Sequence, residues 1–163
     1  MNYKTCKKRS LLLMMLAVLA FTMLLTGCGP SANLTYPEKP IDIEAVAVEE
    51  KGTYTSKEEV AAYIYKFGKL PSNYITTTEA EDLGWVSSVG NLTEVAPGKS
   101  IGGNRFGNRE GYLPDKEGRL YYMCDINYEQ GFRQSERLVF TYDGLVYYTP
   151  DNYETFEYVC GEE

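Results

Sequence analysis

The sequence has 163 residues, a length that fits one domain, and 44% of them are hydrophobic and 24% charged, which excludes a disordered chain and a polytopic membrane protein. It contains no histidine, so a histidine general base, a histidine metal site and a Ser-His-Asp triad are excluded. The only charges in the first 27 residues are Lys4, Lys7, Lys8 and Arg9. The remaining residues, 28–163, contain 12 Lys and Arg and 23 Asp and Glu. Their net charge of about −11 disfavours long-range attraction to polyanions.

Residues 1–27 have the pattern of a secretory signal peptide, in which the basic residues precede an apolar run from Leu11 to Leu25. This run is shorter than the roughly 20 apolar residues that span a bilayer. Leu25-Thr26-Gly27-Cys28 resembles the cleavage site of bacterial lipoproteins, which implies that Cys28 becomes a lipid-modified N-terminus. The alternative is an uncleaved anchor with a chance cysteine. We therefore expect an extracytoplasmic, membrane-anchored lipoprotein.

The next segment, residues 28–55, is expected to be the lipidated cysteine and a tether. It contains three prolines and an acidic stretch, and no period is sustained along it. Alternating apolar residues in 41–47 are compatible with a short extended piece. As a coil, this segment would hold a folded domain of residues 56–163 roughly 30 Å from the membrane.

Helical patterns open the predicted domain. Ser56-Lys57-Glu58-Glu59 has the form of a capping box, apolar residues follow at helical spacing, and Gly68 ends this helix. Residues 76–79 begin a second helix that ends at Gly84, and residues 91–95 predict a third, short one. The inward-facing residues of the second helix are expected to be Ala80 and Leu83.

From Ser100 onwards the apolar pattern has a period of two, which is typical of strands. Strands are expected within residues 119–127, 137–142, 145–149 and 156–159, with a hairpin turn at Asp143-Gly144. This order predicts an α+β fold, with N-terminal helices packed on one face of a mainly antiparallel, roughly five-stranded sheet. The opposite face is expected to be open and to hold a ligand.

Two cysteines remain in the predicted domain, Cys124 and Cys160, and export would permit a disulfide between them. Two free thiols are equally compatible with the sequence. No cluster of residues has metal-ligand spacing, and we expect neither a metal nor a cofactor.

Several motifs occur in one order at fitting intervals: Lys69–Thr76, Leu83–Val86, Val95–Gly103, Asn108–Gly111, Asp125–Tyr128 and Gly131–Arg133. They closely resemble the barnase and binase family of secreted, guanyl-preferring bacterial ribonucleases, over about residues 56–160. The resemblance implies the microbial ribonuclease fold and cleavage of single-stranded RNA after guanosine. In that family a glutamate is the general base, a histidine is the general acid, and the product is a 2′,3′-cyclic phosphate.

The resemblance places binding residues on matching positions of this chain. Asn108, Arg109 and Glu110 match the loop that reads guanine, with Glu110 accepting from the guanine edge. The phosphate-binding arginines match Arg133 and Arg137, and Tyr153 matches the tyrosine beside the catalytic histidine.

The proton-transfer groups of the family do not match. Met123 occupies the position of the catalytic glutamate and Asn152 that of the histidine. Thr77 and Asn104 stand where the family has a lysine and an aspartate. Because general acid–base catalysis contributes about 10²–10⁴-fold per group, cleavage should fall by several orders of magnitude.

Two other residues are candidates to replace the missing general base and general acid. Asp125 is a candidate base, although the family uses this aspartate to orient an arginine. Tyr153 is a poor acid near neutral pH, since the reference pKa of tyrosine is about 10. The tyrosines of the strands, Tyr121, Tyr122, Tyr147 and Tyr148, would either stack with bases or pack in the sheet.

The favoured hypothesis is a lipid-anchored pseudoenzyme of this family that weakly binds RNA or a guanine nucleotide and acts as a monomer. A barstar-like acidic protein that engages the same arginines is a further candidate partner (barnase–barstar being a standard example of charge-steered association). The alternative is an active guanyl-preferring endoribonuclease with substituted acid and base, because fold alone does not decide function. A purely structural role with a decayed site is the third possibility.

Overall fold

The computed structural model describes residues 33–163. The predicted signal peptide and Cys28 lie outside the described residues and stay predictions. Within residues 33–163, no helix is long and apolar enough to cross a membrane.

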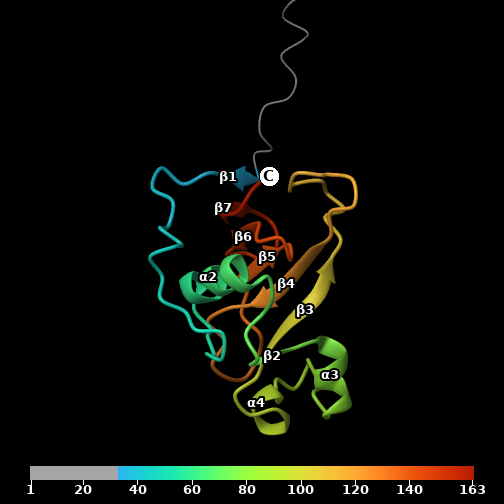
Figure 1. The fold of residues 1–163 in the computed structure, drawn as a ribbon. Coiled ribbons are helices and arrows are strands. Elements are labelled where there is room, and N and C mark those ends of the chain that lie inside the picture. Colours follow the sequence, from blue (N-terminus) through green and yellow to red (C-terminus); the bar gives the residue numbers. More distant parts are fainter. Residues whose placement is uncertain (1–32) are drawn as a thin grey trace, which may run out of the picture. The chain divides into compact units, whose positions relative to one another are not determined.

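One seven-stranded sheet, in the order β1-β7-β6-β5-β4-β3-β2, organises the structure (Figure 1). Its strands are β1 (Leu34–Thr35), β2 (Tyr74–Ile75), β3 (Ser100–Phe106), β4 (Tyr121–Asp125), β5 (Arg137–Phe140), β6 (Val146–Thr149) and β7 (Phe156–Cys160). The five central strands, β3 to β7, pair antiparallel, as the alternating sequence pattern predicted. The two-residue strands β1 and β2 add parallel pairs at the two edges. The α+β fold with a mainly antiparallel sheet is therefore confirmed.

Helix α2 (Lys57–Phe67) packs against β5, β6 and β7 (Figure 1). Ser56 caps it as predicted, because its Oγ accepts from the Glu59 amide and donates to Glu59 Oε2 at 2.6 Å. Gly68 ends it with φ +61, a left-handed conformation that favours glycine. Buried apolar residues of α2 join one face of the sheet in a core: Val60, Ala61, Ala62, Tyr63 and Ile64.

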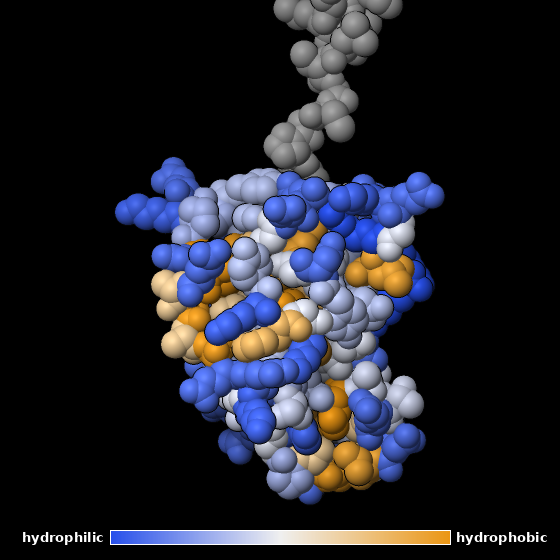
Figure 2. Space-filling view, in the orientation of Figure 1, coloured by the Kyte–Doolittle hydropathy of each residue, from blue (hydrophilic) through white to orange (hydrophobic). Residues whose placement is uncertain are grey.

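Helices α3 (Thr77–Asp82) and α4 (Leu92–Val95) lie at the β2 end of the sheet. Ala80 is buried as expected, but the inward placement of Leu83 is wrong: α3 ends at Asp82, and Leu83 is a C-cap residue whose side chain is 54% exposed. Val86 and Val89 are also exposed, and Figure 2 shows apolar surface at this end of the molecule.

The described part of the expected tether, residues 33–55, does not form a free coil. Leu34 and Thr35 pair with Phe156 and Glu157 of β7. Ile43 and Val48 are buried in the core that α2 builds. The physical reason is that these apolar side chains cover α2 and complete the core, a gain that outweighs the entropy of a free chain.

We had expected the sheet face opposite α2 to be open, but it is closed over part of its length. Apolar side chains cover the middle of it in a second core: Leu113, Tyr121, Met123, Val139, Leu145, Tyr147 and Phe156. The loop between β3 and β4 contributes Leu113 to this core. Any ligand site on this face is therefore confined to the ends of the strands.

Cys124 and Cys160 are both buried and both free. Strands β5 and β6 separate their strands, β4 and β7, in the sheet. Of the two alternatives left open by the sequence, the structure has the free thiols.

Candidate functional site

A buried carboxylate, Asp125, holds two arginines together at the end of the β4–β5 pair. Arg133 Nε and Nη2 donate to Asp125 Oδ2 and Oδ1, each at 2.7 Å. Arg137 Nε lies 2.7 Å from Asp125 Oδ1, although it is not aligned for a hydrogen bond. Because Asp125 is 1% exposed and both its oxygens face guanidinium groups, its role is to position the arginines.

The two arginines differ in their access to solvent. Arg137 is 5% exposed and donates through Nη1 to the backbone oxygens of Gln134 and Glu136. Arg133 is half-buried and comes from the loop between β4 and β5. Burial by itself would lower the pKa of Arg133, but its hydrogen bonds and attraction to Asp125 raise that pKa above the usual value. Two cations against one carboxylate leave a positive charge at this end of the sheet.

Tyr153 connects this cluster to β3. Thr149 Oγ1 accepts from the Tyr153 amide at 2.9 Å, Tyr153 has a φ of +76, and its side chain packs against the second core. The rings of Tyr153 and Phe106 have centroids 5.1 Å apart. Burial raises the pKa of the Tyr153 hydroxyl, while Arg137 and Arg133 oppose this rise only in part. No sequence motif marks Phe106, and its place at the site follows from its contact with Tyr153 and from its position in the lining of the hollow at the next loop.

The loop after β3 is tightly held by Asn108. Its side chain donates to the Leu113 oxygen at 2.9 Å and accepts from the Leu113 amide at 3.1 Å. Its φ of +41 and its backbone bond to Gly111 close the turn. Arg109 and Glu110 are exposed at the tip and line a hollow of about 440 Å³ together with Arg105 and Phe106. The predicted loop residues therefore lie around one surface hollow.

Met123 and Asn152 cannot act as a general base and a general acid. Met123 is 7% exposed and packs in the second core, opposite Val139. Asn152 is exposed, its φ is +53, and its amide donates to the Ser135 oxygen. A thioether and an amide have no proton equilibrium near neutral pH.

The strand tyrosines divide between packing and partial exposure. Tyr121 and Tyr147 are buried, which removes them as base-stacking residues. Tyr122 packs against Phe140 and Tyr142. Tyr148 donates to Glu136 Oε1 at 2.6 Å and has Lys57 over its ring.

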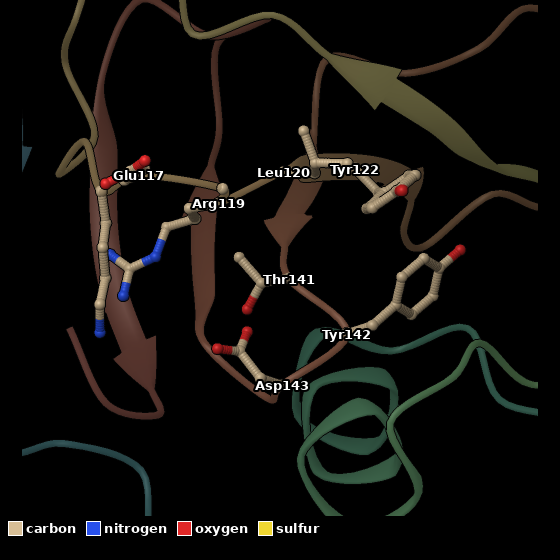
Figure 3. Close-up of a pocket in the computed structure, with 9 residues that line it drawn as sticks. Glu117, Arg119, Leu120, Tyr122, Thr141, Tyr142 and Asp143 are labelled. Atoms are coloured by element: carbon tan, nitrogen blue, oxygen red, sulfur yellow. The ribbon is translucent and has the colours of Figure 1, made fainter.

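Another hollow, of about 340 Å³, lies at the opposite end of β4 and β5 from Asp125 (Figure 3). Arg119 extends along one side of it, Tyr122 and Tyr142 form the other, and Asp143 lies between them. Of the candidate residues named from the sequence, Tyr122 alone lines it. In the part of the chain that the structure describes, no group of three or more His, Cys, Asp or Glu could hold a metal ion.

Known proteins resemble this chain over most of the described domain. The sequence profile of the ribonuclease family matches residues 57–159. The chain belongs to the ribonuclease family. A curated ribonuclease of Heyndrickxia coagulans is 57% identical over 97 residues, which cover 60% of this chain and 89% of that protein.

Ribonucleases of Bacillus intermedius and Bacillus pumilus are also 57% identical over 97 residues. The match covers 60% of this chain and 60% of the length of each of these two ribonucleases. The barnase and binase resemblance of the motifs is thus confirmed at the level of the family.

Proposed function

We propose that this ribonuclease-family chain is a lipid-anchored, extracytoplasmic protein that binds RNA or a guanine nucleotide and cleaves RNA weakly or not at all. The observation that carries the proposal is the burial of Met123 in an apolar core, at the position that the resemblance assigns to the general base. Two residues further along β4, Asp125 still forms ion pairs with Arg133 and Arg137. Binding groups are present, whereas proton-transfer groups are replaced.

Binding is supported by the charge and exposure of the site. Asp125 uses only two of the donor atoms of Arg133, which leaves further N–H groups of a half-buried guanidinium for a phosphate. The loop that carries Arg109 and Glu110 is braced by Asn108, so a guanine edge would meet a preformed surface.

The candidates for a substitute base and acid are unsuited to those tasks. Asp125 faces guanidinium groups with both oxygens and has almost no exposed surface. Tyr153 has a raised pKa, so it gives up a proton less readily than an ordinary tyrosine. Transition-state stabilisation by Arg133 and Arg137 would remain, and it would support slow cleavage at most.

The second candidate function is a guanyl-preferring endoribonuclease that uses substituted groups. Tyr153 favours it, because the charges of Arg137 and Arg133 lower the pKa of its hydroxyl and thereby oppose part of the rise that burial causes. A barstar-like acidic partner would meet the same positive cluster, and we propose a monomer in its absence. A purely structural role would need neither partner nor nucleotide.

A cleavage assay tests the proposal. The full-length protein in a nonionic detergent is incubated with single-stranded RNA that contains GpA, and 2′,3′-cyclic ends are measured. Met123→Glu combined with Asn152→His should raise cleavage by at least 10²-fold, because residues two apart on β4 share a face and the new carboxylate would lie beside Asp125. Met123→Gln combined with Asn152→His is the matched control without a base.

Three outcomes decide between the candidates. An inert wild type and an active Glu/His variant support a binding protein that lost proton transfer. Rapid cleavage by the wild type that disappears in Arg137→Ala establishes the endoribonuclease. Inactivity of both, without binding of guanosine 3′-monophosphate, leaves the structural role.

A further inference from the structure

Three arginines meet at one hollow behind the loop after β3. Arg105 lies near the end of β3, Arg109 in the loop, and Arg119 just before β4. They line a hollow of about 330 Å³, and Asp115 is its one acidic lining residue. This hollow, which we call the arginine hollow, is distinct from the Asp125–Arg133–Arg137 cluster.

The charges of the arginine hollow are not neutralised within the described residues. The ion pairs of residues 33–163 involve Lys57, Lys69, Arg133 and Arg137, and none involves the three arginines of the hollow. Arg119 Nη2 lies 3.5 Å from the Glu162 backbone oxygen, and Arg119 also acts on the Tyr121 hydroxyl, where it opposes the rise of that pKa caused by burial. The three arginines line one hollow and repel one another there, although Arg119 also lines the hollow of Figure 3. The chain has an excess of acidic residues, yet none of them forms an ion pair with these arginines within residues 33–163. Because these three arginines form no ion pair within the described residues, an anion that binds in the hollow would reduce their mutual repulsion.

The walls of the hollow are fixed by hydrogen bonds of the loop. Asn108 braces the Leu113 side, and Tyr121 donates from its hydroxyl to the Pro114 oxygen at 2.7 Å. The Arg119 amide donates to the Lys116 oxygen at 2.9 Å. An anion would therefore enter a preformed site, and little ordering of the chain would oppose its binding.

We propose that the arginine hollow is a second phosphate-binding site. Its ligand is a phosphate group. This group belongs either to an RNA strand whose guanosine lies on the 107–112 loop or to a free guanine nucleotide that carries a second phosphate. Planar guanidinium groups favour phosphate through paired N–H donors. The physiological ligand rests on the proposed nucleotide-binding function, whereas the affinity for phosphate itself does not.

The position of the hollow separates it from the first phosphate site. In the register of the sheet, Arg105 of β3 lies opposite Tyr122 of β4, and Arg137 of β5 lies opposite Asp125, three residues further along β4. At about 3.4 Å per residue, the two positions are about 10 Å apart along the sheet. Arg105 also points to the opposite face from Asn104 and Phe106 because side chains alternate along a strand. An RNA strand that binds at the Asp125–Arg133–Arg137 cluster and also reaches the arginine hollow must therefore pass around the loop after β3.

The test compares two double variants that remove the same charge. Arg105→Gln with Arg119→Gln removes the hollow's cations, and Lys39→Gln with Lys51→Gln removes two exposed lysines of the 33–55 segment. Full-length protein in nonionic detergent is titrated with a fluorescent RNA hexanucleotide whose single guanosine is 2′-deoxy, at several salt concentrations. A single-stranded phosphate contact contributes about 0.7 to the salt slope.

We expect the arginine variant to lower the slope by about 0.7 to 1.4 and to weaken hexanucleotide binding two- to fivefold. Its affinity for guanosine 3′-monophosphate should fall by a smaller factor than its affinity for the hexanucleotide, because Arg105 also lines the hollow beside Arg109 and Glu110. The lysine variant should change none of these three quantities. Dependence of guanosine 3′,5′-bisphosphate binding on Arg105 identifies the free nucleotide as the source of the phosphate, and dependence of the hexanucleotide alone identifies the strand.

Inorganic phosphate gives an arm that is independent of RNA binding. Millimolar phosphate should shift the Nε–Hε signals of Arg105 and Arg119 in nuclear magnetic resonance spectra, in the wild type even if guanosine 3′-monophosphate does not bind. Absence of these shifts overturns the proposal, as does an equal loss of salt slope in the arginine and lysine variants. Failure of guanosine 3′-monophosphate to bind overturns only the proposed function.

Discussion

Asn104 and Thr77 are joined by two hydrogen bonds that connect β3 to the first residue of α3. The Thr77 amide donates to Asn104 Oδ1 at 3.0 Å, and Asn104 Nδ2 donates to Thr77 Oγ1 at 2.7 Å. These are the positions at which the resemblance to barnase and binase implied a lysine and an aspartate. Two charged groups are thus replaced together by two neutral groups that satisfy each other.

Removal of the Thr77 hydroxyl should destabilise the fold. Thr77→Val leaves the Asn104 Nδ2 group without this partner in a half-buried place, and we expect a loss of about 1 kcal/mol in the free energy of unfolding, measured with urea. Thr78→Val is the matched control, since Thr78 is exposed on the next position of α3, and it should change stability by less than about 0.5 kcal/mol. Equal losses in both variants would contradict a specific role of this bond.

The segment before α2 should contribute to stability as part of the domain. Val48 is 6% exposed, and Val48→Ala should cost about 2 kcal/mol because it removes buried methyl groups and leaves a cavity. Val89→Ala makes the same change at a side chain that is 62% exposed and should be nearly neutral. If urea unfolding shows no difference between the two, residues 33–55 do not pack in solution as described.

Binding of guanosine 3′-monophosphate should depend on Arg133. Arg133→Gln removes charged N–H donors while Asp125 keeps Arg137, and we expect affinity to fall about 10-fold, as measured by calorimetry. Lys51→Gln removes the same charge from an exposed side chain and should have no effect. An unchanged affinity in Arg133→Gln would place the phosphate elsewhere.

Glu136 should make stability depend on pH. Hydrogen bonds from Tyr148 and Asn127 hold the pKa of Glu136 below its usual value. A carboxylate whose folded-state pKa is depressed stabilises the fold above its unfolded-state pKa, and this contribution is lost as pH falls through the folded-state pKa. Glu136→Gln should therefore be less stable than the wild type at pH 7, with a smaller difference near pH 3.

The control for this pH effect is Glu154→Gln, because the described contacts of the exposed Glu154 involve only its backbone. Urea unfolding at the two pH values measures both variants. A constant difference between wild type and Glu136→Gln would show that the carboxylate is not coupled to folding.

Cys124 and Cys160 should be unreactive in the folded protein. Burial raises the pKa of both thiols, that of Cys160 to about 12, so little thiolate forms at pH 8. Iodoacetamide should alkylate either residue only after unfolding, as shown by peptide mapping with mass spectrometry. Recovery of a peptide that links Cys124 to Cys160 would disprove the free thiols.

Local signals in the sequence were sufficient for much of the fold. Ser56 and Gly68 mark the ends of α2 through capping and left-handed backbone, both of which depend on neighbouring residues alone. Asp143-Gly144 identifies the β5–β6 hairpin in the same way. The motif around Asp125 and Arg133 likewise indicated the family, which the profile match over residues 57–159 confirms. The site residues that it implies stay predictions.

Tertiary structure decided what local patterns could not express. The packing of Ile43 and Val48 on α2 depends on residues distant in sequence, so a stretch without a period was expected to be a coil. Tyr121 and Tyr147 are buried because Leu113, from the loop after β3, helps to cover their face of the sheet. Arg105 and Arg119 meet only because β3 and β4 pair, which places residues fourteen apart around one hollow. Side-chain chemistry was readable from the sequence, whereas burial and convergence required the folded chain.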